Sequence, residues 1–198
     1  EPSVPADCRE DIVAARNRGD EIVDLIQTAR RLSTDVSGEG GERSVDVRDP
    51  LSAAVADVRE AYPAATVECD APDEAVWVRV DGMVETVFDH LLTNAVQHND
   101  PASVHVTATI SVDPGTVRIT VADDGEGVPP DRLAQLFDEA AFVHTRDWGG
   151  FGLAIVQALV EEYDGRVWAE ANDPSGTVVH VELPRAAGPD GDGRDSSA

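Results

Sequence analysis

The chain contains 198 residues, of which 39 are acidic and 15 are basic, and its formal net charge is −24 at pH 7. Every basic residue is an arginine, and lysine is absent. Such an excess of negative charge repels nucleic acids and anionic membrane surfaces, so neither is expected as a partner. The composition is typical of proteins from halophilic archaea, in which salt screens the self-repulsion of an acidic surface. An acidic protein from a mesophile is the alternative.

The cysteines and the hydropathy pattern set further limits. Cys8 and Cys69 are far apart and lack metal-ligand spacing, which argues against a zinc motif or a disulfide framework and favours a reducing cytosol. No apolar run approaches the roughly 20 residues needed to cross a bilayer, and there is no signal peptide. The chain begins at Glu1 rather than methionine. We therefore expect a cytoplasmic part of a longer protein, which as a whole could still be attached to a membrane.

The N-terminal region predicts one helix followed by a linker. From Asp7 to Ser33, apolar residues recur at steps of three and four and form a single stripe. A lone helix cannot bury this stripe, so it needs a partner helix or packs back on its own domain. The segment from Ser37 to Glu42 is too rich in glycine to form a helix or a strand. The expected segments are a helical region at 1–36, a linker at 37–43, a folded domain at 44–184 and a disordered acidic tail at 185–198.

Within the domain, predicted helices and strands follow one another in mixed order. Pro50 fits the first turn of a helix that continues to Ala61, with Asp49 as its expected cap. Asp81 is expected to cap a helix that ends near Asn99. The other predicted elements are strands at 44–47, 66–69, 76–80, 103–112, 116–121, 166–171 and 177–183, a hairpin turn at 113–115, and helices at 131–137 and 150–163. Helices combined with antiparallel hairpins indicate an α+β fold, a two-layer α/β sandwich with its helices on one face.

A strand-to-turn motif, Val121 to Gly127, lies near the middle of this domain. The strand pattern ends in a carboxylate at Asp123, and a turn with glycine at positions 125 and 127 follows. Glycine accepts positive φ and lets a backbone approach a ligand closely. The motif therefore offers a fixed acceptor beside a polar turn, although a plain hairpin loop is the alternative.

Four further motifs flank this turn in a fixed order. They are His90 to Asn99 on an amphipathic helix, Leu136 to Asp138, Gly149 to Val156 at the start of an apolar helix, and Ser175 to Thr177 before the last strand. Together the five segments resemble the asparagine, glycine and phenylalanine boxes of the ATP-binding catalytic domain of sensor histidine kinases, in the superfamily shared with gyrase, Hsp90 and MutL. The resemblance covers residues 44–183 and implies a Bergerat-type ATP-binding fold.

The resemblance implies a site for ATP and Mg²⁺. Asp123 would accept a hydrogen bond from the adenine amine. It would exclude guanine, whose edge presents the opposite pattern of hydrogen-bond donors and acceptors. Asn94 would be the metal ligand, because magnesium prefers oxygen ligands and keeps several waters. Free N–H groups at the helix start near Gly150 would bind phosphate. The ATP-contacting set implied by the resemblance is Asn94, His98, Asp123, Gly125, Gly127, Phe137, Gly150, Phe151, Gly152, Leu153 and Thr177.

The resemblance also implies a lid between Phe137 and Gly149, which would shield the reacting phosphate from water. His144 and Arg146 lie in this segment and are candidates to reach the γ-phosphate, although exposed charges on loops are usually only solvated. The lid is short for the family, and Trp148-Gly149 replaces the usual Gly-Thr before the second glycine box.

Three positions in the asparagine box depart from the family pattern. His90 stands where the kinases usually carry asparagine and the hydrolytic relatives carry a glutamate base. It is therefore a candidate catalytic residue, with metal binding and space filling as alternatives. Gln97 replaces the usual Lys or Arg that contacts phosphate, and His98 replaces an aromatic residue.

The function implied is the ATP-binding catalytic core of a two-component sensor histidine kinase, which passes the γ-phosphoryl group to a histidine and then to a response regulator. No histidine in this sequence has the phosphoacceptor context, so the acceptor is expected outside this chain. The helical region at 1–36 would be the second helix of a dimerisation hairpin and would give a homodimer. A nucleotide-gated interaction module without transfer, and an ATPase or serine kinase of the same superfamily, are the alternatives.

Overall fold

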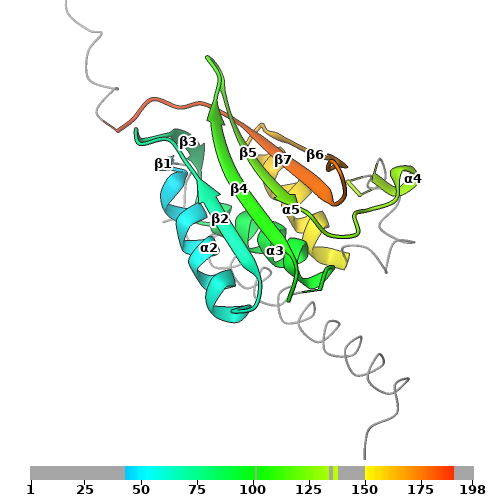
Figure 1. Cartoon of the computed structure of the whole chain (residues 1–198). Coiled ribbons are helices and arrows are strands. Elements are labelled where there is room, and N and C mark those ends of the chain that lie inside the picture. The colour runs from blue at the N-terminus through cyan, green and yellow to red at the C-terminus, as the bar shows by residue number, and fades with distance from the viewer. Residues whose placement is uncertain (1–42, 101, 134–135, 138–149, 190–198) are drawn as a thin grey trace, which may run out of the picture. The chain divides into compact units, whose positions relative to one another are not determined.

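The computed structural model describes residues 43–100, 102–133, 136–137 and 150–189 (Figure 1). The predicted N-terminal helix and the predicted lid lie outside these residues. Within the described ranges, no helix has both the length and the apolar character needed to cross a membrane. In chain order the elements are β1 (Arg43–Asp46), α2 (Arg48–Ala61), β2 (Thr66–Asp70), β3 (Trp77–Val80), α3 (Val84–Gln97), β4 (His105–Val112), β5 (Thr116–Asp123), α4 (Pro130–Leu133), α5 (Gly150–Glu162), β6 (Arg166–Ala171) and β7 (Thr177–Pro184).

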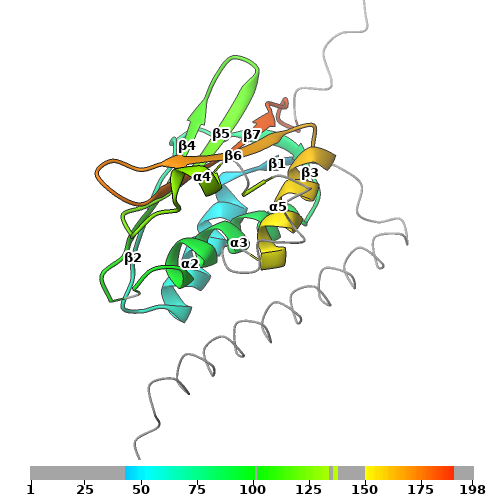
Figure 2. The same ribbon diagram turned by 90° about the vertical axis from the view of Figure 1, so that its right-hand side faces the viewer.

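Five strands form a mixed sheet in the order β2-β4-β5-β7-β6. β2 runs parallel to β4, and the other neighbouring pairs are antiparallel. Helices α2, α3 and α5 cover one face of this sheet (Figure 2). β1 and β3 form a separate two-stranded antiparallel sheet. The predicted α+β sandwich is confirmed, although the expected strands at 66–69 and 76–80 belong to different sheets.

The β4–β5 hairpin carries the strand on which the predicted site depends. The Asp113 N–H donates to the Thr116 carbonyl at 2.9 Å and closes the predicted turn. Along β5, the odd-numbered residues from Val117 to Asp123 are buried, whereas the residues between them are only half-buried. This alternation follows from the two-residue repeat of a strand. Asp123 is therefore the last inward-facing residue of β5, on the face that packs against the helices.

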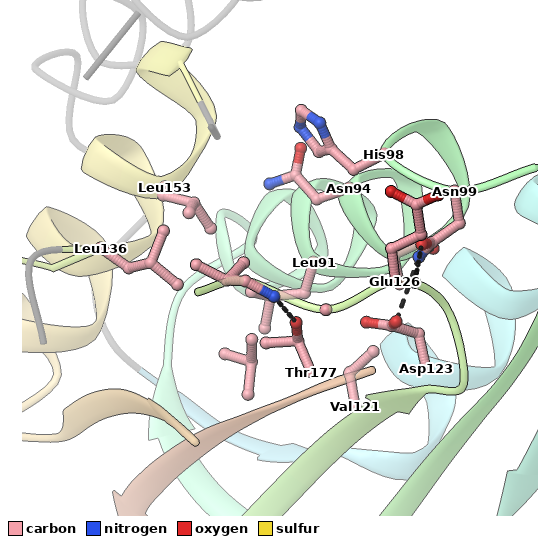
Figure 3. Close-up of a pocket in the computed structure, with 14 residues that line it drawn as sticks. Leu91, Asn94, His98, Asn99, Val121, Asp123, Glu126, Leu136, Leu153 and Thr177 are labelled. Atoms are coloured by element: carbon pink, nitrogen blue, oxygen red, sulfur yellow. Dashed lines mark hydrogen bonds between the residues drawn. The ribbon is translucent and has the colours of Figure 1, made fainter. Parts of the chain in front are cut away.

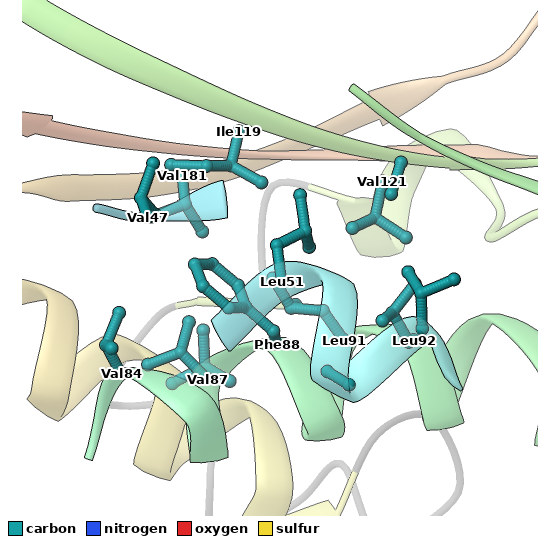
Figure 4. Packing of buried hydrophobic residues seen from close by; sticks show 14 of the residues in the cluster. Val47, Leu51, Val84, Val87, Phe88, Leu91, Leu92, Ile119, Val121 and Val181 are labelled. Atoms are coloured by element: carbon teal, nitrogen blue, oxygen red, sulfur yellow. The ribbon is translucent and has the colours of Figure 1, made fainter. Parts of the chain in front are cut away.

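Helix α3 supplies much of the core beneath the sheet. The residues predicted to face inward are all buried: Val84, Val87, Phe88, Leu91, Leu92 and Ala95. Figure 4 shows Phe88 of α3 and Leu51 of α2 pointing toward the sheet, where Ile119 lies. Phe88, Leu51 and Leu92 are each 0% exposed. This packing fixes α3 against β5 and thereby sets the separation between their polar residues.

The start of α2 differs from the prediction. The helix begins at Arg48, and Asp49 lies in its first turn without capping it. Asp46, the last residue of β1, contacts the helix start instead, because its Oδ1 accepts from the backbone N–H groups of Arg48 at 3.3 Å and Val76 at 3.1 Å. The Arg48 guanidinium beside Asp46 holds the pKa of that carboxyl below its ordinary value. Asp46 thus joins the helix start to the segment before β3.

Two other predicted boundaries move. Helix α4 ends at Leu133, four residues before the predicted end at Phe137. The chain after β7 also stays attached to the domain beyond residue 184: Arg185 N–H donates to Gly115 O at 3.0 Å, and Ala186 N–H donates to Trp77 O at 2.8 Å. Ser44 Oγ donates to Ala187 O at 2.9 Å. The tail expected to be disordered from residue 185 is therefore ordered at its start by backbone hydrogen bonds, which need no large apolar side chain.

The sheet face opposite the helices carries a polar and aromatic cluster. The Trp168 ring stacks on His180 with centroids 4.9 Å apart, and the Arg166 guanidinium lies 4.6 Å from the Trp168 ring centroid. Glu182 pairs with Arg118 at 2.9 Å and with Arg166 at 3.0 Å. These contacts connect β5, β7 and the edge strand β6, and they engage two of the chain's few basic side chains away from the helical layer.

Replacing Phe88 by alanine should destabilise the domain by about 3–5 kcal/mol, because the truncation removes a fully buried ring and leaves a cavity between α3 and the sheet. Urea unfolding of both proteins at one fixed salt concentration would measure the change. Val112, which is 37% exposed, provides the control, and Val112→Thr should change the free energy of unfolding by no more than about 0.5 kcal/mol. Equal losses in the two variants would contradict this account of the core.

Candidate functional site

A cavity lies between α3, the end of β5 and the start of β7 (Figure 3). One wall comes from a single face of α3, where the spacing of its lining residues follows the helical repeat. The turn after β5, together with Leu136 and with Leu153 of α5, completes the enclosure. The lining residues are Leu91, Asn94, Ala95, His98, Asn99, Val121, Asp123, Glu126, Gly127, Val128, Leu136, Leu153, Thr177 and Val179. The predicted meeting of Asp123 and Asn94 in one cavity is therefore observed.

Asp123 is the buried acid of this cavity, with 7% of its surface exposed. Its Oδ1 accepts from the Gly125 N–H at 3.0 Å and from the Asn99 side-chain amide at 3.1 Å. Burial raises the pKa of Asp123 above its ordinary value, and the hydrogen bonds from Gly125, Asn99 and the Thr177 backbone oppose that rise. The second carboxylate oxygen points into the cavity (Figure 3). Asp123 can therefore accept a hydrogen bond from a ligand there.

The loop between β6 and β7 holds the backbone of Asp123 from the other side. Asn172 Nδ2 donates to the Asp123 carbonyl at 2.7 Å. Gly176 has φ of +110°, and a Cβ placed there would lie 1.9 Å from the same carbonyl oxygen. No larger residue fits that approach, which explains the glycine before Thr177. The acid is thus fixed through both its side chain and its main chain.

The α3 wall presents an amide and an imidazole. Asn94 and His98 lie one turn apart and both line the cavity. Among the residues that the structure describes, the Asn94 Nδ2 atom is buried and has no hydrogen-bond partner. A buried amide left unsatisfied costs free energy, and a ligand that used it would recover that cost. This arrangement fits a ligand-binding role for Asn94.

Thr177 closes the end of the cavity beneath the turn. Thr177 is 8% exposed, and its Oγ1 accepts from the Val128 N–H at 3.1 Å. This bond joins the start of β7 to the segment after the predicted glycine box. The apolar walls come from different elements: Val121 from β5, Val179 from β7 and Leu153 from α5. A flat apolar group would be enclosed between these walls and the α3 face.

Several predicted site residues do not line the cavity. Gly125 contributes its N–H to Asp123 from behind the wall. Phe137 is half-buried against the core, and its neighbour Leu136 lines the cavity instead. His90 lies beside the first turn of α5, where a Cβ placed on Gly152 would be 3.1 Å from its Nδ1.

The rest of the predicted phosphate region is described only in part. Helix α5 begins at Gly150, as the second glycine box predicted. The Phe151 side chain and residues 138–149, which include His144, Arg146 and Trp148, lie outside the described set. Gln97, which replaces a family cation, donates from Nε2 to the Tyr62 hydroxyl at 2.7 Å and is not a lining residue.

Asn99 is the main residue that sequence reasoning missed. It lies two residues beyond α3, yet its side chain contacts Asp123 and the turn at Glu126. The asparagine box was expected to act through Asn94 and His98, with His90 as a candidate catalytic residue. The one signal in the sequence was that a second asparagine follows His98, which carries no indication of a contact 24 residues away along the chain.

Sequence comparison places the domain in a known family. Residues 67–187 match the sequence model of the family described as histidine kinase-, DNA gyrase B-, and HSP90-like ATPase. The chain belongs to this family. The chain is similar to the sensor histidine kinase TrcS of Mycobacterium tuberculosis, with 35% identity over 176 residues, covering 82% of this chain and 33% of TrcS. The sensor histidine kinase WalK of Bacillus subtilis is 32% identical over 121 residues, covering 57% of this chain and 20% of WalK.

Solved structures agree with this placement. The mycobacterial sensor histidine kinase MprB superposes with a TM-score of 0.61 at 24% identity, covering 73% of this chain and 97% of the MprB chain. Full-length ShkA, solved in complex with AMPPNP, gives a TM-score of 0.61 at 25% identity, covering 94% of this chain and 41% of ShkA. The described domain is accordingly the catalytic ATP-binding domain of a sensor histidine kinase. The chain spans about a third of TrcS and a fifth of WalK.

Replacing Asp123 by asparagine should stabilise the ligand-free kinase domain at neutral pH. Because the folded-state pKa of Asp123 is raised, the folded domain holds this proton more tightly than the unfolded chain does. The associated stability is fully present below the unfolded-state pKa and is lost as pH rises through the folded-state pKa. Asparagine does not titrate, so the variant avoids this loss. In urea unfolding, the variant should therefore have a larger free energy of unfolding than the wild type at pH 7, and the difference should vanish below the ordinary carboxyl pKa of 3.8.

Removing any negative charge also relieves repulsion in so acidic a chain, so this prediction needs a matched control. Asp124→Asn changes the adjacent, exposed carboxylate, whose Oδ1 accepts from the His105 N–H at 2.7 Å. An equal gain in both variants would assign the effect to net charge and contradict a specific cost of burying Asp123.

Proposed function

We propose that this domain binds ATP together with Mg²⁺ and passes the γ-phosphoryl group to a histidine outside this chain, for relay to an aspartate of a response regulator. The observation that carries the proposal is the convergence of Asp123, from β5, and Asn94, from α3, on one cavity. One end of that cavity suits a base with an exocyclic amine, and the α3 wall suits the polar part of a nucleotide.

The buried acid and the apolar walls of the cavity would together bind adenine. An ionised carboxylate accepts hydrogen bonds and donates none, so it selects a ligand edge that carries a donor. The adenine amine is such a donor, and the walls formed by Val121, Val179 and Leu153 would enclose the ring. Guanine presents a carbonyl at the corresponding position and would leave the buried acid facing another acceptor, which costs free energy.

The phosphate end needs positive charge, and none of the fourteen described lining residues is an arginine or lysine. Magnesium would supply that charge when bound and neutralise the phosphate oxygens. No cluster of three or more His, Cys, Asp or Glu side chains that could hold a metal occurs in the described part of the chain. The ion would therefore be held jointly by the Asn94 amide oxygen and the nucleotide, which fits magnesium's preference for few protein ligands.

The remaining proposed roles concern the rest of the asparagine box and the glycine boxes. His98 would contact the nucleotide from the α3 wall, Thr177 would hold the turn at Gly127 in place, and the start of α5 at Gly150 to Gly152 would approach the phosphates. His90 lies next to Gly152, so we assign it a role at the phosphate end rather than at the adenine.

The transfer step requires residues that this domain does not hold. None of the five histidines, at positions 90, 98, 105, 144 and 180, is followed by an acidic residue. The acceptor would come from a dimerisation hairpin whose second helix corresponds to residues 1–36, and the protein would act as a homodimer. The linker at 37–43 would then allow the kinase domain to reach the acceptor histidine.

ATP binding should depend on Asp123 far more than on its neighbour. In calorimetric titrations with Mg²⁺, Asp123→Asn should weaken ATP binding about 10- to 100-fold, because an unmet buried hydrogen bond costs about 1–3 kcal/mol. Asp124→Asn should bind as the wild type does, since Asp124 does not line the cavity. An Asp123→Asn variant that binds ATP normally would overturn the assignment of the adenine end.

Transfer itself should appear in a protein that carries the phosphoacceptor hairpin ahead of this chain. Incubation with γ-labelled ATP should leave phosphate that is labile in acid and stable in base, and Asp123→Asn should reduce it at an ATP concentration near the wild-type Kd. Tight ATP binding without such phosphate would favour a nucleotide-gated interaction module. Steady phosphate release that His90→Ala abolishes would favour an ATPase.

A further inference from the structure

The Asn99 side chain makes three hydrogen bonds at the adenine end of the cavity. Its Nδ2 donates to the Ala95 carbonyl at 2.9 Å and to Asp123 Oδ1 at 3.1 Å, and its Oδ1 accepts from the Glu126 N–H at 3.1 Å. These partners fix the orientation of the amide, because a flipped group would set its oxygen against a carbonyl and a carboxylate. Asn99 therefore ties the end of α3 to both the acid and the turn that follows it.

Gly125 is shaped around this amide. A Cβ placed on Gly125 would lie 1.7 Å from Asn99 Oδ1 and 2.0 Å from its Cγ, and its three nearest atoms all belong to the Asn99 side chain. The Gly125 N–H also donates to Asp123 Oδ1 at 3.0 Å. Two donors from different elements thus converge on the same carboxylate oxygen, and the absence of a side chain at Gly125 is what leaves room for one of them.

We propose that Asn99 is a positioning residue that fixes the Asp123 carboxylate for adenine and thereby sets the preference for purines that carry a 6-amino group. Two N–H groups on Oδ1 restrain rotation of the carboxylate, and its second oxygen stays directed into the cavity (Figure 3). The inference rests on the proposed binding of a nucleotide in this cavity. It adds a residue from the end of α3 to the recognition of the base.

A purely structural role for Asn99 is the competing explanation, since its bond to Ala95 O also satisfies a carbonyl in the last turn of α3. Such a role predicts equal loss for every ligand or loss of stability alone. A positioning role predicts loss only for ligands that use the acid. Gln97 provides a matched control, because it lies at the same helix end and its amide bonds to the Tyr62 hydroxyl outside the cavity.

The deciding experiment compares two triphosphates that differ only in the amine. ATP and purine riboside triphosphate, which lacks the 6-amino group, are titrated with Mg²⁺ into the wild type, Asn99→Ala, Gly125→Ala, the double variant and Gln97→Ala, with urea unfolding of each. Wild type should prefer ATP. Asn99→Ala should reduce that preference about tenfold, the factor expected for one misplaced buried hydrogen bond, while binding of the analogue stays nearly unchanged.

Gly125→Ala provides an independent route to the same state, because its methyl group would displace the Asn99 amide. It should reproduce the reduced preference, and the double variant should be no worse than either single variant, since there is only one amide to remove. Gln97→Ala should keep the wild-type preference. If Asn99→Ala does not fold, Gly125→Ala and the control still decide the question.

The pH profile gives a second readout that a structural role would not move. Asn99 favours the ionised form of Asp123. The other charged or titratable neighbours of Asp123 are Asp124, which is adjacent in the chain and outside the cavity lining, and Glu126 and His98, which line the cavity. Loss of the amide should therefore shift the acid limit of ATP binding to higher pH relative to Gln97→Ala. Wild type that fails to bind ATP would refute the proposed function. Wild type that prefers ATP, with Asn99→Ala preferring it equally or weakening both ligands equally, would refute this inference alone.

Discussion

The site depends on keeping one carboxylate buried at the end of a strand. Asp123 faces the helical layer because it continues the inward alternation of β5, so the same repeat that builds the core also places an acid inside it. A buried charge is costly unless it is hydrogen-bonded. Donors from the Gly125 backbone and the Asn99 side chain offset this cost for Asp123. Asn172 and Gly176 hold the main chain of the same residue. The polar contacts around the cavity converge on this one position.

The apolar core fixes the position of α3 relative to that acid. Asn94 and the buried Phe88 lie on the same helix, and the packing of Phe88 and Leu92 against the sheet fixes the helix relative to β5. Interiors are close-packed, so such a contact transmits a fixed separation rather than a flexible one. The two walls of the cavity are therefore positioned by residues that never touch a ligand. Asn99 adds a polar tie at the open end of the same helix, where the apolar packing stops.

The main elements could be predicted from local repeats in the sequence. Contacts between distant segments could not. The two-residue repeat put Asp123 on the inner face, and the helical repeat identified the buried face of α3 correctly. Asn99 escaped prediction because its role depends on how the end of α3 aligns with a turn beyond β5, which no local pattern records. Asp46 replaced Asp49 at the start of α2 for the same reason, since its partners include Val76, 30 residues away. The attachment of residues 185–187 was missed because it uses backbone groups, which composition does not reveal.

Electrostatics sets the remaining constraint on the proposed function. A triphosphate must approach a chain with a net charge of −24 and enter a cavity lined by Asp123 and Glu126, with no arginine among its described lining residues. Arg118 and Arg166 are engaged with Glu182 on the opposite face of the sheet, and Gln97 bonds to Tyr62. These side chains therefore do not line the cavity and would not contact a triphosphate bound there. Concentrated salt shortens the screening length to about 3 Å at 1 M, which removes most of the long-range repulsion and leaves the short contacts intact. Under such screening the proposed buried acceptor, buried amide and Mg²⁺ would be sufficient, because each would act over a single hydrogen-bond or coordination distance.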